Sequence, residues 1–250
     1  MTQKALIVGV ANERSLAWSI AKHLKKSGFD IALTYQNEAL EKRVKPLAQE
    51  IGADLVLPLD VSNESQVTAA FETIQKKWGN LDTLVHSIAF ANRDDLEGRF
   101  IETPREGFRM ALDISAYSLV QLARAAEPLM KTNGGSILTL SYVGATRVIP
   151  HYNVMGVAKA ALEACVRYLA YDLGPQKIRV NAISAGPVKT LAAAGIRDFR
   201  TMLSQDAETN PLRENIEQDD VGALAAFLCS PAGKHMTGST LFVDSGAHIL

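Results

Sequence analysis

The sequence predicts a single α/β domain with a doubly wound parallel sheet of about seven strands and helices on both faces. Seven short apolar segments alternate with longer amphipathic segments along the 250-residue chain. The short segments are apolar throughout, which is typical of strands buried on both faces of a parallel sheet. Repeated strand–helix units of this kind favour a Rossmann-type sheet, because the competing (β/α)₈ barrel needs an eighth strand and usually a glycine-rich loop late in the chain.

Each predicted strand is a short apolar run bounded by polar or turn-forming residues. The first run could resemble the core of a signal peptide, but it is short, no cationic stretch precedes it, and Glu13-Arg14 closes it. It is therefore interpreted as a strand. The predicted strands are Ala5–Val10, Asp30–Tyr35, Asp54–Asp60, Thr83–Ala89, Ser136–Tyr142, Arg179–Ser184 and Thr240–Asp244.

The segments between these strands carry apolar residues at helical spacing. The predicted helices are Ser15–Ser27, Asn37–Ile51, Glu64–Trp78, Gly107–Met130, Asn153–Leu173 and Gln218–Leu228. The stretch Thr190–Pro211 has poor periodicity and is interpreted as a helix-containing insertion near the carboxyl edge of the sheet. Because no linker, low-complexity tract or charge block interrupts the pattern, residues 1–250 are expected to form one domain.

Composition excludes several classes of function. The apolar fraction of 47% and charged fraction of 21% are ordinary for a compact protein, and the net charge of −1 gives no reason to expect a nucleic acid or an anionic membrane as partner. Cys165 and Cys229 stand alone, which predicts buried, reduced thiols. No apolar run is long enough to span a bilayer, so a cytoplasmic location is expected.

The end of the first strand is the first candidate for cofactor binding, because ligands of such sheets collect beyond the carboxyl ends of the strands. Gly9 lies at the strand exit, and Ser15 and Ala17 are small residues where the next helix begins. A small first turn allows a pyrophosphate to approach the helix amides. An ordinary strand-to-helix turn with Ser15 as N-cap explains the same residues.

The exits of the second and third strands bear on the adenosine half of a cofactor. Gln36 follows the second strand and can bind a ribose hydroxyl without repelling a 2′-phosphate, and Arg43 lies about two helical turns further on. Asp60 ends the third strand, where its carboxylate can accept the adenine amino group or cap a turn. Because Gln36 has no positive charge, NADH is expected, with NADPH possible.

Tyr152 and Lys159 are the residues most suggestive of chemistry. They lie seven residues apart, close to two helical turns, and therefore share one face of the helix after the fifth strand. A lysine ammonium favours negative charge on a phenol, which would make Tyr152 a better proton donor or oxyanion partner. A second phenol, Tyr142, lies ten residues earlier.

Other conspicuous residues have simpler explanations. His86 continues the fourth strand and is expected to be a hydrogen-bonded strand histidine, and His151 has no carboxylate at a suitable spacing. No set of residues has metal-ligand spacing and no G-x-S-x-G elbow is present, so neither a metal site nor a hydrolase is predicted.

Several motifs resemble those of one known family, and the resemblance extends over essentially the whole chain. They are Val85-His86-Ser87-Ile88-Ala89-Phe90-Ala91, Asp113-Ile114-Ser115-Ala116-Tyr117-Ser118, Tyr142 with Tyr152-Asn153-Val154-Met155-Gly156-Val157-Ala158-Lys159, and Arg179-Val180-Asn181-Ala182-Ile183-Ser184-Ala185-Gly186-Pro187-Val188-Lys189-Thr190-Leu191-Ala192. This pattern resembles the bacterial enoyl-acyl-carrier-protein reductases of the short-chain dehydrogenase/reductase superfamily. Most members of that superfamily carry a serine where this chain has Tyr142, and the tyrosine is the most specific signal. Ala89 departs from the family, in which many members have glycine.

The resemblance implies a role for each matching residue. It implies hydride transfer from a nicotinamide cofactor to the β-carbon of a trans-2-enoyl thioester, with Tyr142, Tyr152 and Lys159 as catalytic residues. The implied cofactor contacts are Gly9, Ser15 and Leu16 at the pyrophosphate, Gln36 at the adenosine ribose, Asp60 and Val61 at the adenine, Ile88 near the nicotinamide, Lys159 at its ribose, and Val188, Lys189, Thr190, Leu191 and Ala192 at the carboxamide and phosphates. The implied substrate contacts are Ala91, Tyr142, Tyr152 and Met202.

Two alternative functions remain open. A carbonyl reductase or alcohol dehydrogenase of the same superfamily would use a serine on the fifth strand, for which Ser141 is the only nearby candidate. A non-catalytic nucleotide-sensing protein would have no need of both Tyr152 and Lys159. The resemblance also implies an acyl-carrier-protein thioester as substrate and a homotetramer formed through the long segments Gly107–Met130 and Asn153–Leu173. The insertion at 190–211 is expected to be a mobile lid over the acyl chain.

Overall fold

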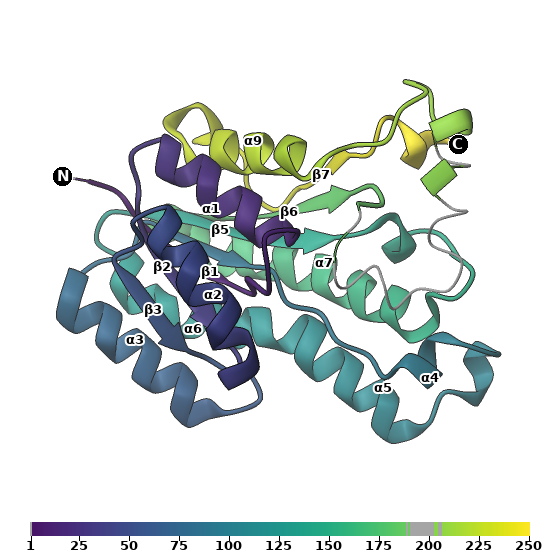
Figure 1. Ribbon diagram of the computed structural model, residues 1–250, viewed down its shortest axis with the longest axis horizontal. Coiled ribbons are helices and arrows are strands. Elements are labelled where there is room, and N and C mark those ends of the chain that lie inside the picture. The colour runs from purple at the N-terminus through teal and green to yellow at the C-terminus, as the bar shows by residue number, and fades with distance from the viewer. Residues whose placement is uncertain (1, 189, 191–202, 205–206) are drawn as a thin grey trace.

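The computed structural model describes residues 2–188, 190, 203–204 and 207–250. Within these ranges, seven parallel strands form one sheet in the order β3-β2-β1-β4-β5-β6-β7 (Figure 1). The strands are β1 (Lys4–Val8), β2 (Asp30–Tyr35), β3 (Leu55–Pro58), β4 (Thr83–His86), β5 (Gly135–Ser141), β6 (Ile178–Ala185) and β7 (Thr240–Val243). This confirms the predicted doubly wound α/β fold. The strand order reverses between β1 and β4, the point at which such sheets bind their ligands.

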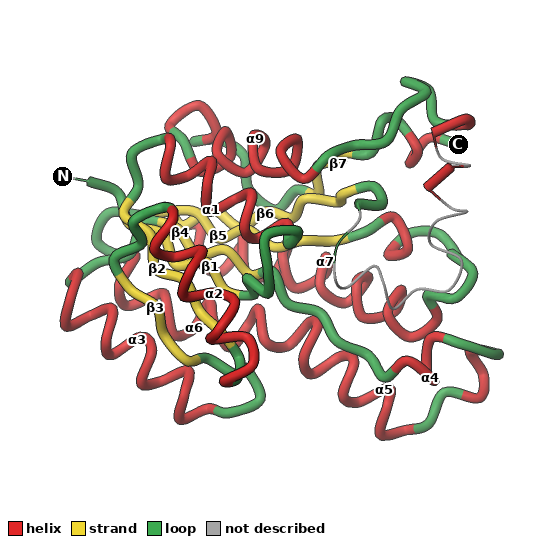
Figure 2. The backbone as a smooth tube through the Cα atoms, in the orientation of Figure 1, coloured by secondary structure: helices red, strands yellow, loops and turns green. Residues whose placement is uncertain are grey.

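Helices cover both faces of the sheet, as Figure 2 shows with helices in red and strands in yellow. The described helices are α1 (Leu16–Lys26), α2 (Glu38–Glu50), α3 (Glu64–Trp78), α4 (Arg93–Leu96), α5 (Arg105–Leu112), α6 (Ser118–Met130), α7 (Asn153–Leu173) and α9 (Gln218–Cys229). Successive residues of β1 point to opposite faces. Ala5 and Ile7 pack with residues of α1, α2 and α9, whereas Leu6 and Val8 pack with residues of α3, α6 and α7. Two apolar cores therefore lie on the two faces.

The helix predicted over Gly107–Met130 is interrupted in the structure. It begins earlier, at Arg105, and a π-helical turn over Asp113–Tyr117 separates α5 from α6. A π-helical turn adds a residue to the turn and reorients the side chains that follow it, and such turns are frequent at functional sites. The interpretation of the sequence used apolar spacing alone, and a π-helical turn is defined by backbone hydrogen bonds, which apolar spacing does not record.

None of the helices in the described ranges has both the length and the apolar character that a membrane span requires.

Candidate active site

The loop between β1 and α1 brings the backbone of two strand ends together. Gly9 has a φ of +108°, and a Cβ there would lie 2.0 Å from the carbonyl oxygen of Ser87, just after β4. Only glycine fits this position. The hydroxyl of Ser15, at the N-cap of α1, donates to the carbonyl of Asn12 over 2.5 Å and does not cap the helix that begins at Leu16. The first backbone amides of α1 therefore have no hydrogen bond from the side chain of the N-cap residue.

The structure joins two residues that the sequence placed at separate strand exits. The side-chain amide of Gln36 donates to the carboxylate of Asp60 over 3.1 Å, and both the amide and the hydroxyl of Ser62 donate to the same carboxylate. Burial acts to raise the pKa of Asp60, but the hydrogen bonds from Ser62 and Gln36 outweigh it and hold the pKa below its ordinary value. Asp60 is therefore an ionised acceptor at neutral pH.

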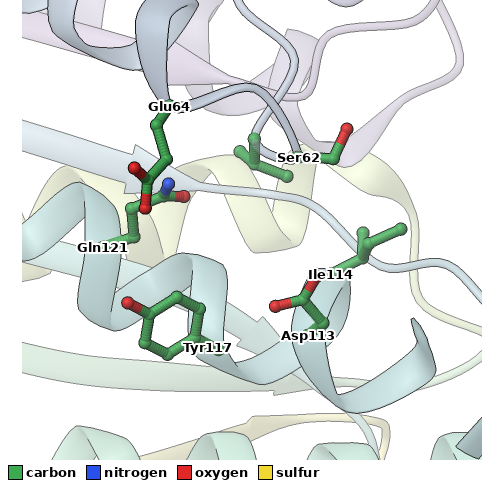
Figure 3. Close-up of a pocket in the computed structure, with 7 residues that line it drawn as sticks. Ser62, Glu64, Asp113, Ile114, Tyr117 and Gln121 are labelled. Atoms are coloured by element: carbon green, nitrogen blue, oxygen red, sulfur yellow. The ribbon is translucent and has the colours of Figure 1, made fainter. Parts of the chain in front are cut away.

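Val61 forms part of the wall of a cavity of about 290 Å³ between the end of β3 and the start of α6 (Figure 3). Ile114 and Tyr117 line it from the π-helical turn, and Gln121 lines it from α6. The sequence assigned none of these three residues to the cofactor or substrate site, and Tyr117 was expected only at a surface between copies of the chain. Ile114 and Tyr117 lie in one of the motifs that carried the family resemblance, so that motif could have pointed to them, although no role in the site was assigned to it.

Tyr142 and Tyr152 meet at the carboxyl end of β5. Their ring centroids are 5.0 Å apart at an interplanar angle of 67°, an edge-to-face contact. Tyr152 is only 9% exposed and packs in an apolar cluster that Ala91 also contacts. Burial, and secondarily Tyr142, raise the pKa of Tyr152 far above its ordinary value, so its hydroxyl stays protonated. Two predicted catalytic residues and one predicted substrate contact are thus brought together.

The backbone on either side of Tyr152 has an unusual conformation and packs closely against its ring. His151 and Asn153, on either side, have φ values of +60° and +35°, a region that residues other than glycine rarely adopt. A Cβ on Gly144 would lie 2.6 Å from Cδ1 of the Tyr152 ring, and a Cβ on Gly156 would lie 2.8 Å from the carbonyl of Gly144. The two glycines therefore allow the β5–α7 loop to close against this tyrosine.

Lys159 lies on α7, buried with 6% of its surface exposed. Its ammonium donates to the carbonyl of Leu140, on β5, over 2.7 Å. Burial lowers the pKa of Lys159 to about 8, against the opposing effect of Glu163. The expectation that this ammonium favours negative charge on Tyr152 stays a prediction; in the structure, burial and secondarily Tyr142 raise the pKa of that phenol.

Ser141, the serine on which a carbonyl reductase would depend, is hydrogen-bonded to a residue of α7. Its hydroxyl donates to the carboxylate of Glu163, on α7, over 2.5 Å, and the residue is 5% exposed. Glu163 was not predicted as a site residue, because a glutamate on an amphipathic helix has the same appearance in a sequence whether it faces solvent or a buried partner.

His86 is a buried structural residue, as the sequence indicated. Its Nδ1 lies 2.7 Å from the hydroxyl oxygen of Thr139 and its Nε2 lies 2.8 Å from that of Ser118. Burial, and secondarily Lys159, lower the pKa of His86 to about 3, so the ring is neutral at neutral pH. It joins β4, β5 and the start of α6.

The loop after β4 is fixed to the π-helical turn by one residue. The hydroxyl of Ser115 accepts a hydrogen bond from the Phe90 amide at 2.9 Å and donates to the Phe90 carbonyl at 3.1 Å. This anchor places Ala91 against the tyrosine cluster, whereas Ile88 packs against the core under α3, α6 and α7.

The predicted contacts after β6 are only partly described. Val188 and Thr190 are joined by a backbone hydrogen bond of 2.7 Å, from the amide of Thr190 to the carbonyl of Val188. Four other predicted contacts lie outside the described residues: Lys189, Leu191, Ala192 and Met202. Most of the predicted lid at 190–211 also lies outside them.

Comparison with known proteins identifies the family that this site belongs to. Residues 9–248 match the family described as enoyl-(acyl carrier protein) reductase. The chain belongs to the enoyl-acyl-carrier-protein reductase family. Family membership confirms the family predicted from the motifs, and with it an oxidoreductase of fatty acid synthesis. It excludes the two alternatives, in agreement with the orientation of Ser141.

Individual relatives match over nearly their whole length. The enoyl-[acyl-carrier-protein] reductase [NADH] of Rickettsia prowazekii is 54% identical over 248 residues, which cover 99% of this chain and 95% of that protein. The reductase of Anaplasma phagocytophilum, solved in complex with NAD, is 52% identical with a TM-score of 0.95, and the match covers 99% of this chain and 94% of that one. The Bacillus cereus reductase, solved with NADP+ and indole naphthyridinone, is 50% identical with a TM-score of 0.97, covering 99% and 97%.

Proposed function

We propose that this chain reduces the double bond of a trans-2-enoyl thioester with NADH, and that the Tyr152 hydroxyl stabilises the negative charge that develops on the thioester oxygen. The observation that carries the proposal is the environment of Tyr152, a protonated phenol buried in an apolar cluster beside Tyr142 and Ala91. A preorganised donor in a site with little water is worth most where charge appears in the transition state. Tyr142 would hold the Tyr152 ring in place through the edge-to-face contact.

The residues present fit a dinucleotide. When bound, the nicotinamide cofactor supplies the hydride that is added to the β-carbon. Gly9 and the uncapped start of α1 would receive the pyrophosphate, with Ser15 and Leu16 at the same turn. Asp60 would accept the adenine amino group, and Val61 would bound the base beside the cavity. Lys159 would move from the Leu140 carbonyl to the nicotinamide ribose.

The same geometry favours NADH over NADPH. Gln36 would bind the adenosine ribose, and its side chain is held by the ionised carboxylate of Asp60. A 2′-phosphate at this ribose would bring two negative charges close to that carboxylate. None of the three side chains of the Gln36–Asp60–Ser62 cluster carries a positive charge that would offset the repulsion.

An assay of substrate class tests the proposed reaction. Loss of NADH would be followed with a crotonyl thioester and, as a matched control, with an acetoacetyl thioester of the same carrier. We expect consumption only with the crotonyl thioester, because Ser141 is turned toward Glu163 and offers no third hydroxyl for a ketone. Consumption only with the acetoacetyl thioester would contradict the proposal.

The proposed assembly is a homotetramer in which α6 and α7 meet their copies. Most of the apolar residues on these helices are used by the chain's own core, such as Leu122 and Leu162, which are fully buried. Large side chains that stay exposed include Tyr117, Tyr168 and Tyr171, at 45%, 75% and 82%. Exposed aromatic side chains of this kind suit a partner surface. A monomer mass from light scattering at micromolar concentration would exclude the proposed assembly.

Three further proposals concern the substrate's carrier, the location and the lid. An enoyl-acyl-carrier-protein thioester is proposed as the natural form of the substrate, and a cytoplasmic location is expected. The lid predicted for residues 190–211 can be tested by hydrogen exchange on residues 191–206 with and without cofactor and acyl ligand. Equal, strong protection in both states would indicate a fixed wall.

A further inference from the structure

The environment of Lys159 contains a carboxylate that the proposed reaction does not use. Glu163 lies four residues after Lys159 on α7, so the two side chains share one face of the helix about one turn apart. The hydroxyl of Ser141, the last residue of β5, donates to this carboxylate over 2.5 Å. The carboxylate is thus held between the strand and the helix, about one helical turn along α7 from the buried Lys159.

Lys159 has few other partners for its charge. Its ammonium donates a hydrogen bond to a neutral carbonyl, that of Leu140. From β4, the nearby ring of His86 is neutral, and its pKa is lowered partly by the lysine. The phenol of Tyr152, on the connection from β5, stays protonated as well. Among the groups acting on Lys159 in the described residues, Glu163 is the one that favours the charged form.

We propose that Glu163 is a positioning residue of the active site, whose carboxylate, oriented by the Ser141 hydroxyl, holds Lys159 as an ammonium in its buried place. An unpaired ammonium would otherwise lose its proton under the cost of burial. The consequence for the reaction rests on the proposed role of Lys159 at the nicotinamide ribose. There, an ammonium donates three hydrogen bonds and carries a positive charge, whereas a neutral amine does neither.

The structure also suggests a matched set of variants. Glu163→Gln removes the charge and keeps an oxygen that can accept from Ser141. Ser141→Ala keeps the charge and removes the hydroxyl that orients it. Asp172→Asn removes one negative charge from an exposed position on the same helix, nine residues further along, at about 13 Å.

The primary measurement is the titration of Lys159 in the free protein, by NMR of lysine labelled with ¹³C at Cε. Lys159→Arg identifies the signal by its loss. In Glu163→Gln the pKa of Lys159 should fall by about one pH unit, the lower end of the effect of one opposite charge nearby. Ser141→Ala should lower it in the same direction by less, and Asp172→Asn should leave it in place. An unchanged pKa in Glu163→Gln, or in Ser141→Ala should Glu163→Gln fail to fold, would overturn the proposal.

A second readout separates this proposal from the proposed function. The affinity for NADH should weaken as pH rises through the pKa of Lys159, and in Glu163→Gln the weakening should begin about one pH unit lower. If the NMR titration shifts as expected but NADH affinity does not depend on pH in either protein, the pairing of Glu163 with Lys159 stands and the placement of Lys159 at the ribose fails. A purely structural role of Glu163 would lower stability without moving either titration.

Discussion

Replacing Gly9 by alanine tests how closely the ends of β1 and β4 must approach to form the cofactor site. The added Cβ would lie 2.0 Å from the carbonyl oxygen of Ser87, and the φ of +108° is itself unfavourable for alanine. Real Cβ atoms essentially never come closer than 3.0 Å, so a backbone held by parallel pairing on both sides must move by about 1 Å. Strain of this kind, added to the left-handed conformation, costs about 4 kcal/mol or more.

Gly28 provides the matched control. It has a φ of +89°, but a Cβ there would meet no atom within 4 Å, so Gly28→Ala pays only the conformational cost of about 1–2 kcal/mol. For a chain of this size, 1 kcal/mol shifts Tm by about 2–4 °C. Thermal unfolding at equal protein concentration should therefore show a fall of about 3 °C for Gly28→Ala and about 10 °C or more for Gly9→Ala. Equal values of Tm for the two variants would refute the close approach.

Three further predictions concern acid stability, the tyrosine pocket and the cofactor. The pKa of His86 is about 3 in the folded protein and about 6.5 when unfolded, so the unfolded state takes up the proton first and stability is lost as pH falls below 6.5. Between pH 6 and 4, the free energy of unfolding measured with urea should fall by up to about 1.4 kcal/mol per pH unit more in the wild type than in His86→Gln. Parallel curves of this free energy against pH would contradict a neutral buried ring. Gly144→Ala places a methyl group 2.6 Å from the Tyr152 ring and should lower kcat by about 10-fold or more, against an unchanged NADH affinity. Steady-state kinetics should give a higher kcat/KM with NADH than with NADPH, and the reverse order would point to Arg43 or Lys42 as a phosphate partner.

The sequence predicted the features that depend on periodicity and on strand exits. The continuous apolar runs gave the parallel sheet, since strands buried on both faces have no polar side. Gly9, Tyr142, Tyr152 and Lys159 follow strands or lie on the first turns beyond them, so their gathering at one edge of the sheet follows from the topology.

Other features depend on three-dimensional contacts that no local pattern records. The π-helical turn at 113–117 is defined by its backbone hydrogen bonds, which no spacing of apolar residues records. Ser141 and Glu163 are 22 residues apart, and their pairing depends on the angle at which α7 crosses β5. The raised pKa of Tyr152 could not be predicted either, because it results from burial of the phenol in a cluster that only the folded chain forms.

The catalytic role of Tyr152 is the central claim, and turnover of Tyr152→Phe tests it most directly. The substitution keeps the ring that packs against Tyr142 and removes only the hydroxyl. With a crotonyl thioester and NADH, kcat should fall by about 10²-fold or more while NADH affinity stays unchanged, the usual consequence of losing one oxyanion donor. Tyr142→Phe, which preserves the edge-to-face contact, is the matched control and should lose less. Wild-type turnover in Tyr152→Phe would contradict the account.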